Sequence, residues 1–217
     1  MRIKLNKVGK RFNKEWIVKN LSLDIPSQSS LSITGANGSG KSTLIKLISA
    51  YMEPTSGNVQ YFKNEKKYSA ESIPYTIGLA TPYLNLIEEF SLKEHLEFHF
   101  KFRVTPHTIG EIMKKSNFQS SIDKKIKDFS SGMKQRLKLA LAIYGENQLI
   151  ILDEPTSNLD QEGIEWYRSQ IQQKLGKCTI IVASNQRHEY DFIPHTINLS
   201  NSDDLSISYL EQLFGTV

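Results

Sequence analysis

The residues with the clearest chemical potential lie between positions 35 and 42. They match G-x-x-x-x-G-K-[ST], a spacing in which glycines let successive backbone N–H groups face one concavity that suits phosphate. Lys41 would reach the β- and γ-phosphates of a nucleoside triphosphate, and the Ser42 hydroxyl would ligate Mg²⁺. The alternative is an ordinary glycine-rich turn before a helix. The predicted binding residues of this segment are Gly35, Ala36, Asn37, Gly38, Ser39, Gly40, Lys41, Ser42 and Thr43.

The segments on either side of this loop support phosphate binding. Residues 30–34 predict a short apolar strand that leads into the loop, and residues 43–48 predict a helix that leads out of it. The partial positive charge at the N-terminus of that helix would lie where a triphosphate sits.

Two adjacent carboxylates end a second apolar run. Residues 148–152 are typical of a central parallel strand, and Asp153 and Glu154 follow it directly. Beside a phosphate loop, Asp153 can hold Mg²⁺ through water, while Glu154 can orient and deprotonate an attacking water. The alternatives are a helix N-cap or a pair of surface acids.

Two aromatic residues, Phe12 and Trp16, fall in a predicted polar turn between strands at residues 2–8 and 21–25. A flat aromatic face can stack on a purine, so either residue could bind the base of a nucleotide. The alternative for each is a partly buried packing aromatic.

The rest of the chain alternates strand and helix patterns around one long helical stretch. Apolar runs predict strands at residues 59–62, 75–80 and 179–183, and a lysine-rich turn separates the first two. Residues 84–144 predict three helices, whose apolar residues are Leu92, Leu96 and Phe100, then Ile109, Ile112 and Met113, then Met133, Leu137, Ala140, Leu141 and Tyr144. A later helix would place Ile164, Tyr167, Ile171 and Leu175 on one face, and residues from 195 onward predict short strands and a last helix.

Composition limits the class of protein. The 217 residues are 39% hydrophobic, and no stretch approaches the ~20 apolar residues of a membrane span or the apolar core of a signal peptide. A single cysteine, Cys178, excludes an internal disulfide and fits a buried thiol. The net charge is +4, and the lysine clusters fit solvated faces, so we expect no nucleic-acid partner. His95 and His99 lie four residues apart without a third ligand, so we predict no metal site there.

Residues 129–136, Phe-Ser-Ser-Gly-Met-Lys-Gln-Arg, resemble the L-S-G-G-Q signature of ABC ATPases. Further matches occur in the order of that family: residues 35–42, residues 149–154, a D-loop at residues 157–160, and Phe12 at the position of the adenine-stacking aromatic. The resemblance implies an α/β fold with a P-loop NTPase core, an N-terminal antiparallel β subdomain and an inserted α-helical subdomain. It further implies one domain over residues 1–217, with its core at 1–83 and 145–217 and its helical subdomain at 84–144.

The same resemblance implies an ATP-binding and ATP-hydrolysing subunit of a transporter, with ATP and Mg²⁺ as cofactors. Two such subunits, identical or different, would dimerise head to tail around two ATP molecules. Ser130, Ser131 and Gly132 of one subunit would face the γ-phosphate held by the other. The partner would be a separate integral-membrane subunit, contacted by the helical subdomain and residues 81–89, which would place this chain on the cytoplasmic face of the membrane. The signature variant resembles that of exporter subunits.

The chain departs from the family pattern at three positions. Ser131 replaces the first signature glycine. Thr81 or Pro82 stands where a glutamine should contact Mg²⁺, and Asn185 stands at the position of the switch histidine, where its amide could still contact the γ-phosphate. These departures leave two alternatives open, namely a soluble ABC ATPase without a transport role and a regulatory nucleotide-binding module with low turnover.

Overall fold

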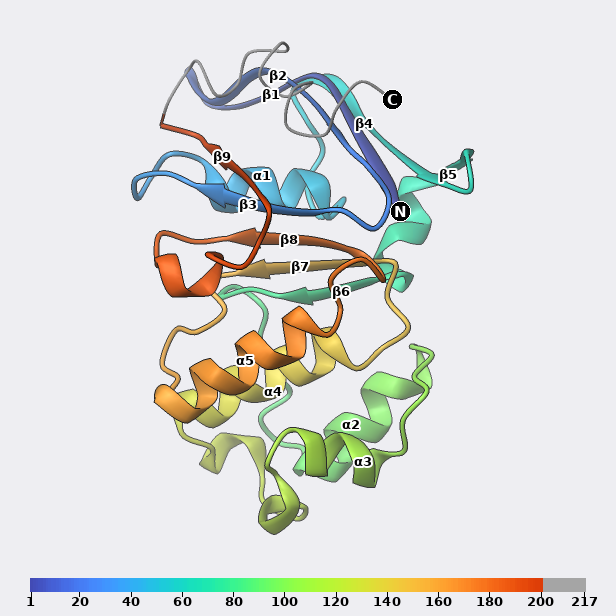
Figure 1. Cartoon of the computed structure of the whole chain (residues 1–217), viewed down its shortest axis with the longest axis vertical. Helices are drawn as coiled ribbons and strands as arrows, with labels where there is room; N and C mark the ends of the chain where they lie inside the picture. Colours follow the sequence, from blue (N-terminus) through green and yellow to red (C-terminus); the bar gives the residue numbers. More distant parts are fainter. Residues whose placement is uncertain (201–217) are drawn as a thin grey trace.

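The structure, a computed structural model, describes residues 1–200 of the chain. In Figure 1 an antiparallel sheet lies at the top, a parallel sheet lies in the centre, and most of the helices lie at the bottom. The predicted combination of an antiparallel β region, a parallel α/β core and a helical region is therefore confirmed. The last helix predicted in the tail lies outside the described residues.

The antiparallel sheet has the strand order β2-β1-β4-β5. Its strands are β1 (Arg2–Phe12), β2 (Glu15–Ile25), β4 (Ser56–Lys63) and β5 (Lys66–Tyr68). Phe12 and Trp16 lie in strands, so their placement in a polar turn was wrong. The turn contains only two residues, and Asn13 adopts the positive φ of 53° that such a tight hairpin favours.

A second hairpin replaces part of the predicted lysine-rich turn. Asn64 and Glu65 both have positive φ, 48° and 61°, which closes a two-residue turn between β4 and β5. A short 3₁₀ helix, η1 (Ala70–Tyr75), follows, and it contains Pro74. The next strand, β6 (Ile77–Ala80), therefore starts two residues later than the sequence predicts.

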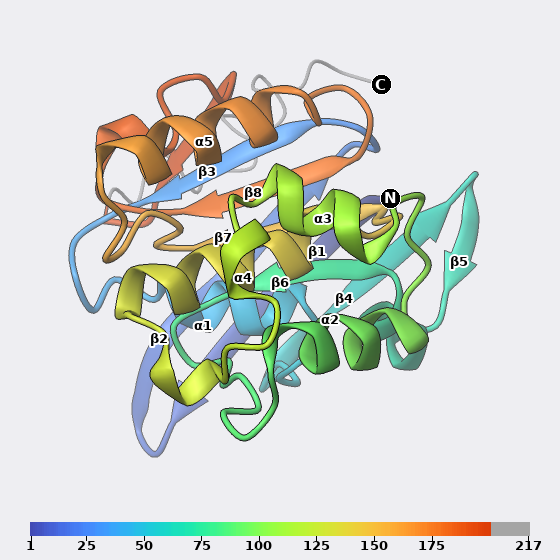
Figure 2. The ribbon, with the colours of Figure 1, turned by 90° about the horizontal axis from the view of Figure 1, so that it is seen from below.

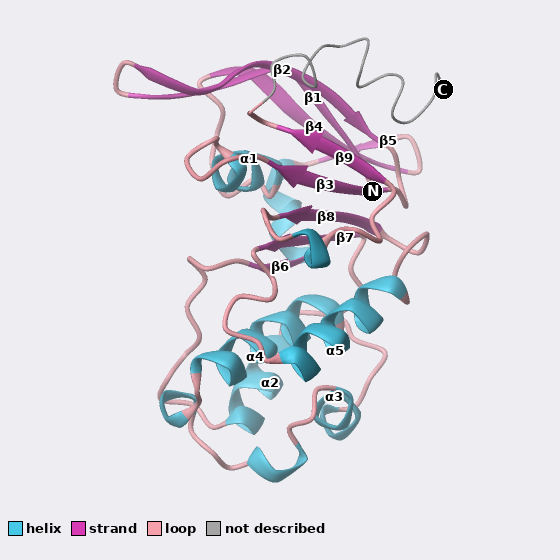
Figure 3. Ribbon diagram, turned by 60° about the vertical axis from the view of Figure 1, so that its left-hand side comes forward, coloured by secondary structure: helices cyan, strands magenta, loops and turns pink. Residues whose placement is uncertain are grey.

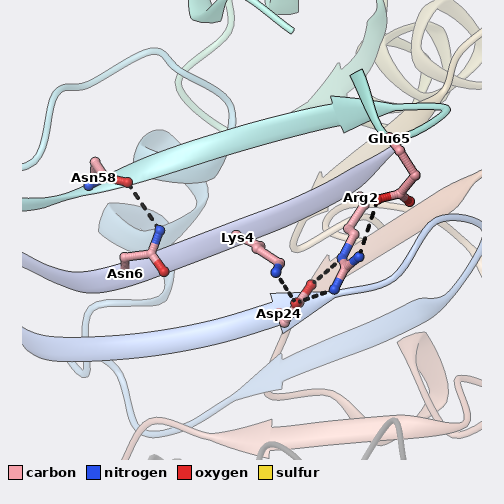
Figure 4. Close-up of polar contacts among 6 residues, drawn as sticks. All are labelled: Arg2, Lys4, Asn6, Asp24, Asn58 and Glu65. Atoms are coloured by element: carbon pink, nitrogen blue, oxygen red, sulfur yellow. Dashed lines mark hydrogen bonds and ion pairs between the residues drawn. The ribbon is translucent and has the colours of Figure 1, made fainter. Parts of the chain in front are cut away.

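Polar side chains join the strands of the antiparallel sheet across one face, as Figure 4 shows. Arg2 donates to both carboxylate oxygens of Asp24, at 2.9 and 2.8 Å, and the Lys4 ammonium lies 3.3 Å from the same carboxylate. Burial alone would raise the pKa of Asp24, but the hydrogen bonds from Arg2 and Lys4 outweigh it and lower this pKa below its usual value.

We expect Asp24→Asn to lower the free energy of unfolding by roughly 0.5–1 kcal/mol at pH 7, as for other partly exposed ion pairs. Because the folded pKa of Asp24 is lowered, its stabilisation is present above the unfolded pKa of about 3.9 and is lost as the pH falls through the folded pKa. Urea denaturation between pH 7 and pH 3 measures the difference. Glu65→Gln is the control, because Glu65 is 82% exposed and lies 3.7 Å from Arg2. Equal effects of the two substitutions would contradict the prediction.

The parallel sheet has the strand order β6-β7-β8-β3-β9. Its remaining strands are β3 (Ser30–Thr34), β7 (Leu149–Asp153), β8 (Thr179–Ala183) and β9 (His195–Asn198). Every pairing in it is parallel, so all carboxyl ends meet at one edge, where the arrowheads point in Figure 1. That edge gathers the loops that follow β3, β7 and β8.

Successive residues of the central strands enter different cores, which explains their continuous apolar sequences. Leu149 and Ile151 of β7 pack with the antiparallel sheet and the helix α1 (Lys41–Ile48). Ile150 and Leu152 pack on the opposite side with the remaining helices. Figure 3 shows α1 between the two sheets and the other helices beyond β6.

Four further helices lie on that opposite side: α2 (Leu92–Lys101), α3 (Ile109–Lys115), α4 (Ser131–Ile143) and α5 (Gln161–Gln172). Figure 2, viewed from below, shows α2, α3 and α4 in front of the sheet. The single apolar face predicted for α4 is too narrow, because Leu139, Ala142 and Ile143 are also buried between the sheet and its neighbours. Leu175 lies beyond the end of α5.

Candidate nucleotide-binding site

The loop of residues 35–42 joins the end of β3 to the start of α1. Gly40 has a φ of 98°, which favours glycine, and a Cβ atom there would also make a tight 3.0 Å contact with Ile17 Cγ2. No described side chain caps the N-terminus of α1. The first N–H groups of this helix are therefore oriented to bind an anion.

Lys41 is held over its own loop. Its side chain is buried, and Nζ donates to the carbonyl oxygens of Gly35 at 2.7 Å and Ala36 at 3.2 Å. The ammonium therefore lies in the concavity of the loop, where it can pair with phosphate oxygens.

Asp153 and Glu154 follow β7 at the same edge of the sheet. Asp153 is 2% exposed, and its Oδ2 has no hydrogen-bond partner in the described structure. Burial is the main cause that raises its pKa, and the charges of Glu154 and Glu189 add to this, while a hydrogen bond with Ser42 and the charge of Lys41 oppose it. A buried, unpartnered carboxylate oxygen beside a serine hydroxyl fits Mg²⁺, which prefers oxygen ligands.

The backbone of Glu154 is strained and firmly held. Its φ is 49°, a left-handed angle that costs about 1 kcal/mol or more for a residue with a side chain. Its N–H donates to the Ala183 carbonyl at 2.9 Å, at the end of β8. The side chain is exposed, so it can reach a bound ligand and a water molecule.

A cavity of about 440 Å³ brings most of the predicted residues together. It is lined by Phe12, Ile17, Asn37, Gly38, Gly40, Lys41, Ser42, Thr43 and Glu154. Gly35, Ala36 and Ser39 belong to the loop but do not line this cavity. Of the two candidate aromatics, Phe12 lines the cavity and is 44% exposed, whereas Trp16 does not line it and packs under the Arg11 guanidinium.

Sequence reasoning missed Ile17 as part of this cavity. The residue falls in β2, directly after the hairpin that was predicted as a longer turn. A tight two-residue turn at Asn13 would have placed Ile17 in a strand that returns toward the loop, so the hairpin signal could have found it.

Asn185 contacts the phosphate loop from the next strand. It follows β8, and its Nδ2 donates to Asn37 Oδ1 at 2.9 Å. His188, three residues later, instead lies 2.9 Å from the Thr156 hydroxyl through Nε2. The side chain at position 185, rather than the nearby histidine, is therefore adjacent to the loop.

The signature-like segment lies in a different part of the molecule. Ser130 caps α4 by accepting a hydrogen bond from the Met133 N–H at 3.2 Å, and a Cβ atom on Gly132 would lie 2.7 Å from the Asn158 carbonyl. Ser130, Ser131 and Gly132 line a second cavity of about 470 Å³ with residues 158–160. The two cavities share no residue, so one chain does not bring this segment to its own phosphate loop.

The segment after β6 carries no glutamine, and the structure places Thr81 there in a buried position. Its carbonyl oxygen accepts a hydrogen bond from Lys138 Nζ of α4 at 3.4 Å. Lys134, one turn earlier on α4, forms a 2.6 Å ion pair with Glu88. Both lysines therefore tie this segment to the helix that begins at the signature.

Known proteins provide an independent comparison. The model of the ABC transporter family matches residues 18–157. The chain is 31% identical over 202 residues to the uncharacterized ABC transporter ATP-binding protein YcbN of Bacillus subtilis (strain 168). That alignment covers 91% of this chain and 66% of YcbN. The chain therefore spans about two thirds of the length of that relative. It is also 31% identical over 204 residues to the lantibiotic transport ATP-binding protein SrtF of Streptococcus pyogenes, covering 88% of this chain and 85% of SrtF.

A solved structure agrees with these relatives. The dimeric post-hydrolysis state of the ATP-binding cassette MJ0796, bound to ADP and Pi, matches with a TM-score of 0.77 and 25% identity over 90% of this chain and 93% of that chain. Sequence, fold and loop geometry lead to one assignment. The chain belongs to the ABC transporter family, as an ATP-binding domain.

Proposed function

We propose that this chain binds and hydrolyses ATP with Mg²⁺ and thereby drives transport through a separate integral-membrane subunit. The observation that supports this best is that Lys41, Ser42 and Glu154 line one cavity, next to the buried Asp153 carboxylate. The whole chain would be one domain over residues 1–217, with its helical subdomain at residues 84–144.

Each residue has a distinct role in the proposed reaction. Lys41 and the N–H groups of the loop bind the phosphates, while Ser42 and Asp153 hold Mg²⁺, which neutralises charge on the phosphate oxygens. Glu154 accepts a proton from water as the water oxygen attacks the γ-phosphorus, and ADP leaves with the electrons of the broken bond. Asn185 donates to an oxygen of the γ-phosphate, and Phe12 stacks on adenine.

Dimerisation completes the proposed site. Ser130, Ser131 and Gly132 lie in a cavity separate from the phosphate loop, so a second subunit, identical or different, supplies them. The N-terminus of α4 would then point at the γ-phosphate across the interface. The dimeric state of the MJ0796 cassette supports this arrangement.

A groove between the sheet and the helices supports the proposed contact with a membrane subunit. This cavity of about 490 Å³ is lined by residues 49–51, by residues of β6, the 84–86 segment, α2 and α4, and by Arg103, which follows α2. Its basic and imidazole side chains are His95, His99, Arg103 and Lys138. Burial, with smaller contributions from Arg103 and His95, lowers the pKa of His99 to about 4, so the positive charge at neutral pH comes from Arg103 and Lys138. No carboxylate of residues 1–200 lines it, so a partner segment with an acidic side chain fits.

The proposed location is the cytoplasmic face of the membrane, and the proposed direction is export. No helix within residues 1–200 combines the length and the apolar character needed to cross a bilayer. The signature variant with Ser131 supports the direction. We propose no nucleic-acid partner.

Steady-state hydrolysis tests the enzymatic part of this function. The purified chain should release phosphate from ATP in the presence of Mg²⁺ and not in the presence of EDTA. Tight ATP binding with no phosphate release above background would instead favour the regulatory module. That alternative is worth testing because position 185 carries no histidine.

Co-purification tests the transport part of the proposed function. The chain should be recovered together with a membrane-spanning subunit, and Arg103→Glu should abolish this association. Recovery of the chain only from the soluble fraction would contradict the transport role.

Asn185→Ala should lower kcat about tenfold with little change in ATP affinity, because one hydrogen bond to a charged group contributes ~1.5–3 kcal/mol. Asparagine does not titrate, so residue 185 should add no limb to the pH–rate profile of the wild type. Asn185→His should add one near pH ~6.5. Arg187→Ala, an exposed neighbour, is the control. An Asn185→Ala variant as fast as wild type would exclude the proposed phosphate contact.

A further inference from the structure

A carboxylate outside the predicted site is fully buried close to it. Glu189 ends the short 3₁₀ helix η4 (Arg187–Glu189), four residues after Asn185, and its exposed fraction is 0%. Acidic residues are rarely buried this completely unless they are paired with a cation. Within residues 1–200 Glu189 has no ion pair and its buried Oε2 has no hydrogen-bond partner, so the hydrogen bonds to Oε1 are the polar contacts that hold the carboxylate.

Among the described residues, both hydrogen bonds to the Glu189 carboxylate come from Thr156. Oε1 accepts from the backbone N–H of Thr156 at 2.6 Å and also from the Thr156 hydroxyl. Because that hydroxyl donates to Glu189, it accepts from Nε2 of His188 at 2.9 Å. Two consecutive side chains of the segment after β8, His188 and Glu189, therefore hydrogen-bond to Thr156.

Thr156 lies two residues after Glu154, in the turn that carries the proposed general base. From α4, Gln135 donates through Nε2 to the Pro155 carbonyl of the same turn at 2.8 Å. The strained φ of 49° at Glu154 needs support from the surrounding structure, and these contacts add to the hydrogen bond between Glu154 N–H and the Ala183 carbonyl. The turn is therefore clamped between the signature helix and the segment that carries Asn185.

The backbone of Glu189 is anchored as firmly as its side chain. Its carbonyl oxygen accepts from the hydroxyl of the buried Tyr167 at 2.8 Å, and its N–H donates to the Gln186 carbonyl at 2.9 Å. Tyr167 belongs to α5, which is part of the lower core. Movement of the turn that carries Glu154 would therefore require movement of this whole packed unit.

We propose that Glu189 is a positioning residue for ATP hydrolysis, which holds Glu154 and Asn185 in one rigid unit through Thr156. This inference rests on the proposed function. The carboxylate is suited to the task because its Oε1 accepts two hydrogen bonds at once, from the backbone N–H and the hydroxyl of Thr156. A loose turn would still bind ATP, since Lys41 and the loop glycines lie on other elements, but it would misplace the base.

Glu189→Ala should lower kcat by about tenfold to a hundredfold, the scale of a 1 Å misplacement, while the affinity for a fluorescent ATP analogue changes less than about twofold. Glu189→Gln keeps an oxygen that can accept from the Thr156 N–H, so it should recover most of this loss. Thr156→Ser should behave like wild type and Thr156→Val like Glu189→Ala. The double variant Glu189→Ala/Thr156→Val should lose no more kcat than either single variant. Glu165→Gln, at an exposed carboxylate of α5, is the control.

Hydrogen exchange gives a second readout that does not depend on activity. The amide of Thr156 should exchange at least about tenfold faster in Glu189→Ala, while the amides of β7 stay protected. Unchanged kcat and unchanged exchange in a folded Glu189→Ala variant would overturn the proposal. A kcat loss that Glu189→Gln does not recover, or that adds to the loss from Thr156→Val, would also overturn it. A wild-type chain without Mg²⁺-dependent hydrolysis would contradict the proposed function itself, and the exchange rates would then decide on the clamp alone.

Discussion

Glu154→Gln should reduce the ATP hydrolysis rate by about a thousandfold, because a glutamine amide cannot accept the proton of the attacking water. MgATP binding should remain, since the proposed phosphate contacts come from Lys41 and the N–H groups of the loop, and the proposed Mg²⁺ contacts come from Ser42 and Asp153. Steady-state phosphate release and titration with a fluorescent ATP analogue measure the two properties separately. Hydrolysis within tenfold of wild type would show that another group activates the water.

The same variant should trap ATP between two chains. Without hydrolysis, the proposed ATP-bridged dimer accumulates, so light scattering should report a shift from monomer to dimer at saturating MgATP. Ser131→Arg added to Glu154→Gln should weaken this dimer, because the larger side chain would fill the space of the partner's γ-phosphate. Dimerisation that is unaffected by Ser131→Arg would contradict the proposed place of the signature at the interface.

Lys41→Ala should weaken MgATP binding by more than about a hundredfold, because hydrogen bonds from an ammonium to charged phosphate oxygens contribute ~1.5–3 kcal/mol each. The substitution also removes the two hydrogen bonds from Nζ to the Gly35 and Ala36 carbonyls, so the loop loses its internal brace. Calorimetric titration with MgATP measures the affinity.

Lys46→Ala is the matched control for this prediction. Lys46 belongs to the same helix, but its ammonium lies over the Tyr83 ring, 4.4 Å from the ring centroid, and it does not line the nucleotide cavity. Its removal should leave MgATP affinity within about twofold of wild type, since it contacts no phosphate. Equal losses for the two lysines would show that the net positive charge of the helix, rather than the position of Lys41, binds ATP.

Local sequence determined the elements that carry the chemistry. The predicted bounds of β3 and β8 agree with the structure, because both strands are buried on both faces and every residue in them is apolar or small. The glycines at positions 35, 38 and 40 all adopt the positive φ that a phosphate-binding turn needs. Such features depend on the backbone and on near neighbours, so the sequence could predict them.

The tight hairpins were harder to predict from the sequence. Asn13, Asn64 and Glu65 adopt positive φ in two-residue turns, although asparagine and glutamate also occur in longer loops. Their conformation is selected by the pairing of the flanking strands, such as Arg11 with Trp16. Ile17 falls in the segment that was predicted as a turn, so its contact with the phosphate loop was missed as well.

Only the tertiary structure decided which residues share a cavity. It separated Ser130 from Lys41, selected Phe12 over Trp16, and joined Asn185 to Asn37 across 148 positions of sequence. It also placed Glu189 on Thr156, 33 positions away. The contacts of Asn185 and Glu189 exist because the parallel strands β3, β7 and β8, distant in the chain, end at one edge of a sheet. Residue type or local spacing does not encode which strands become neighbours.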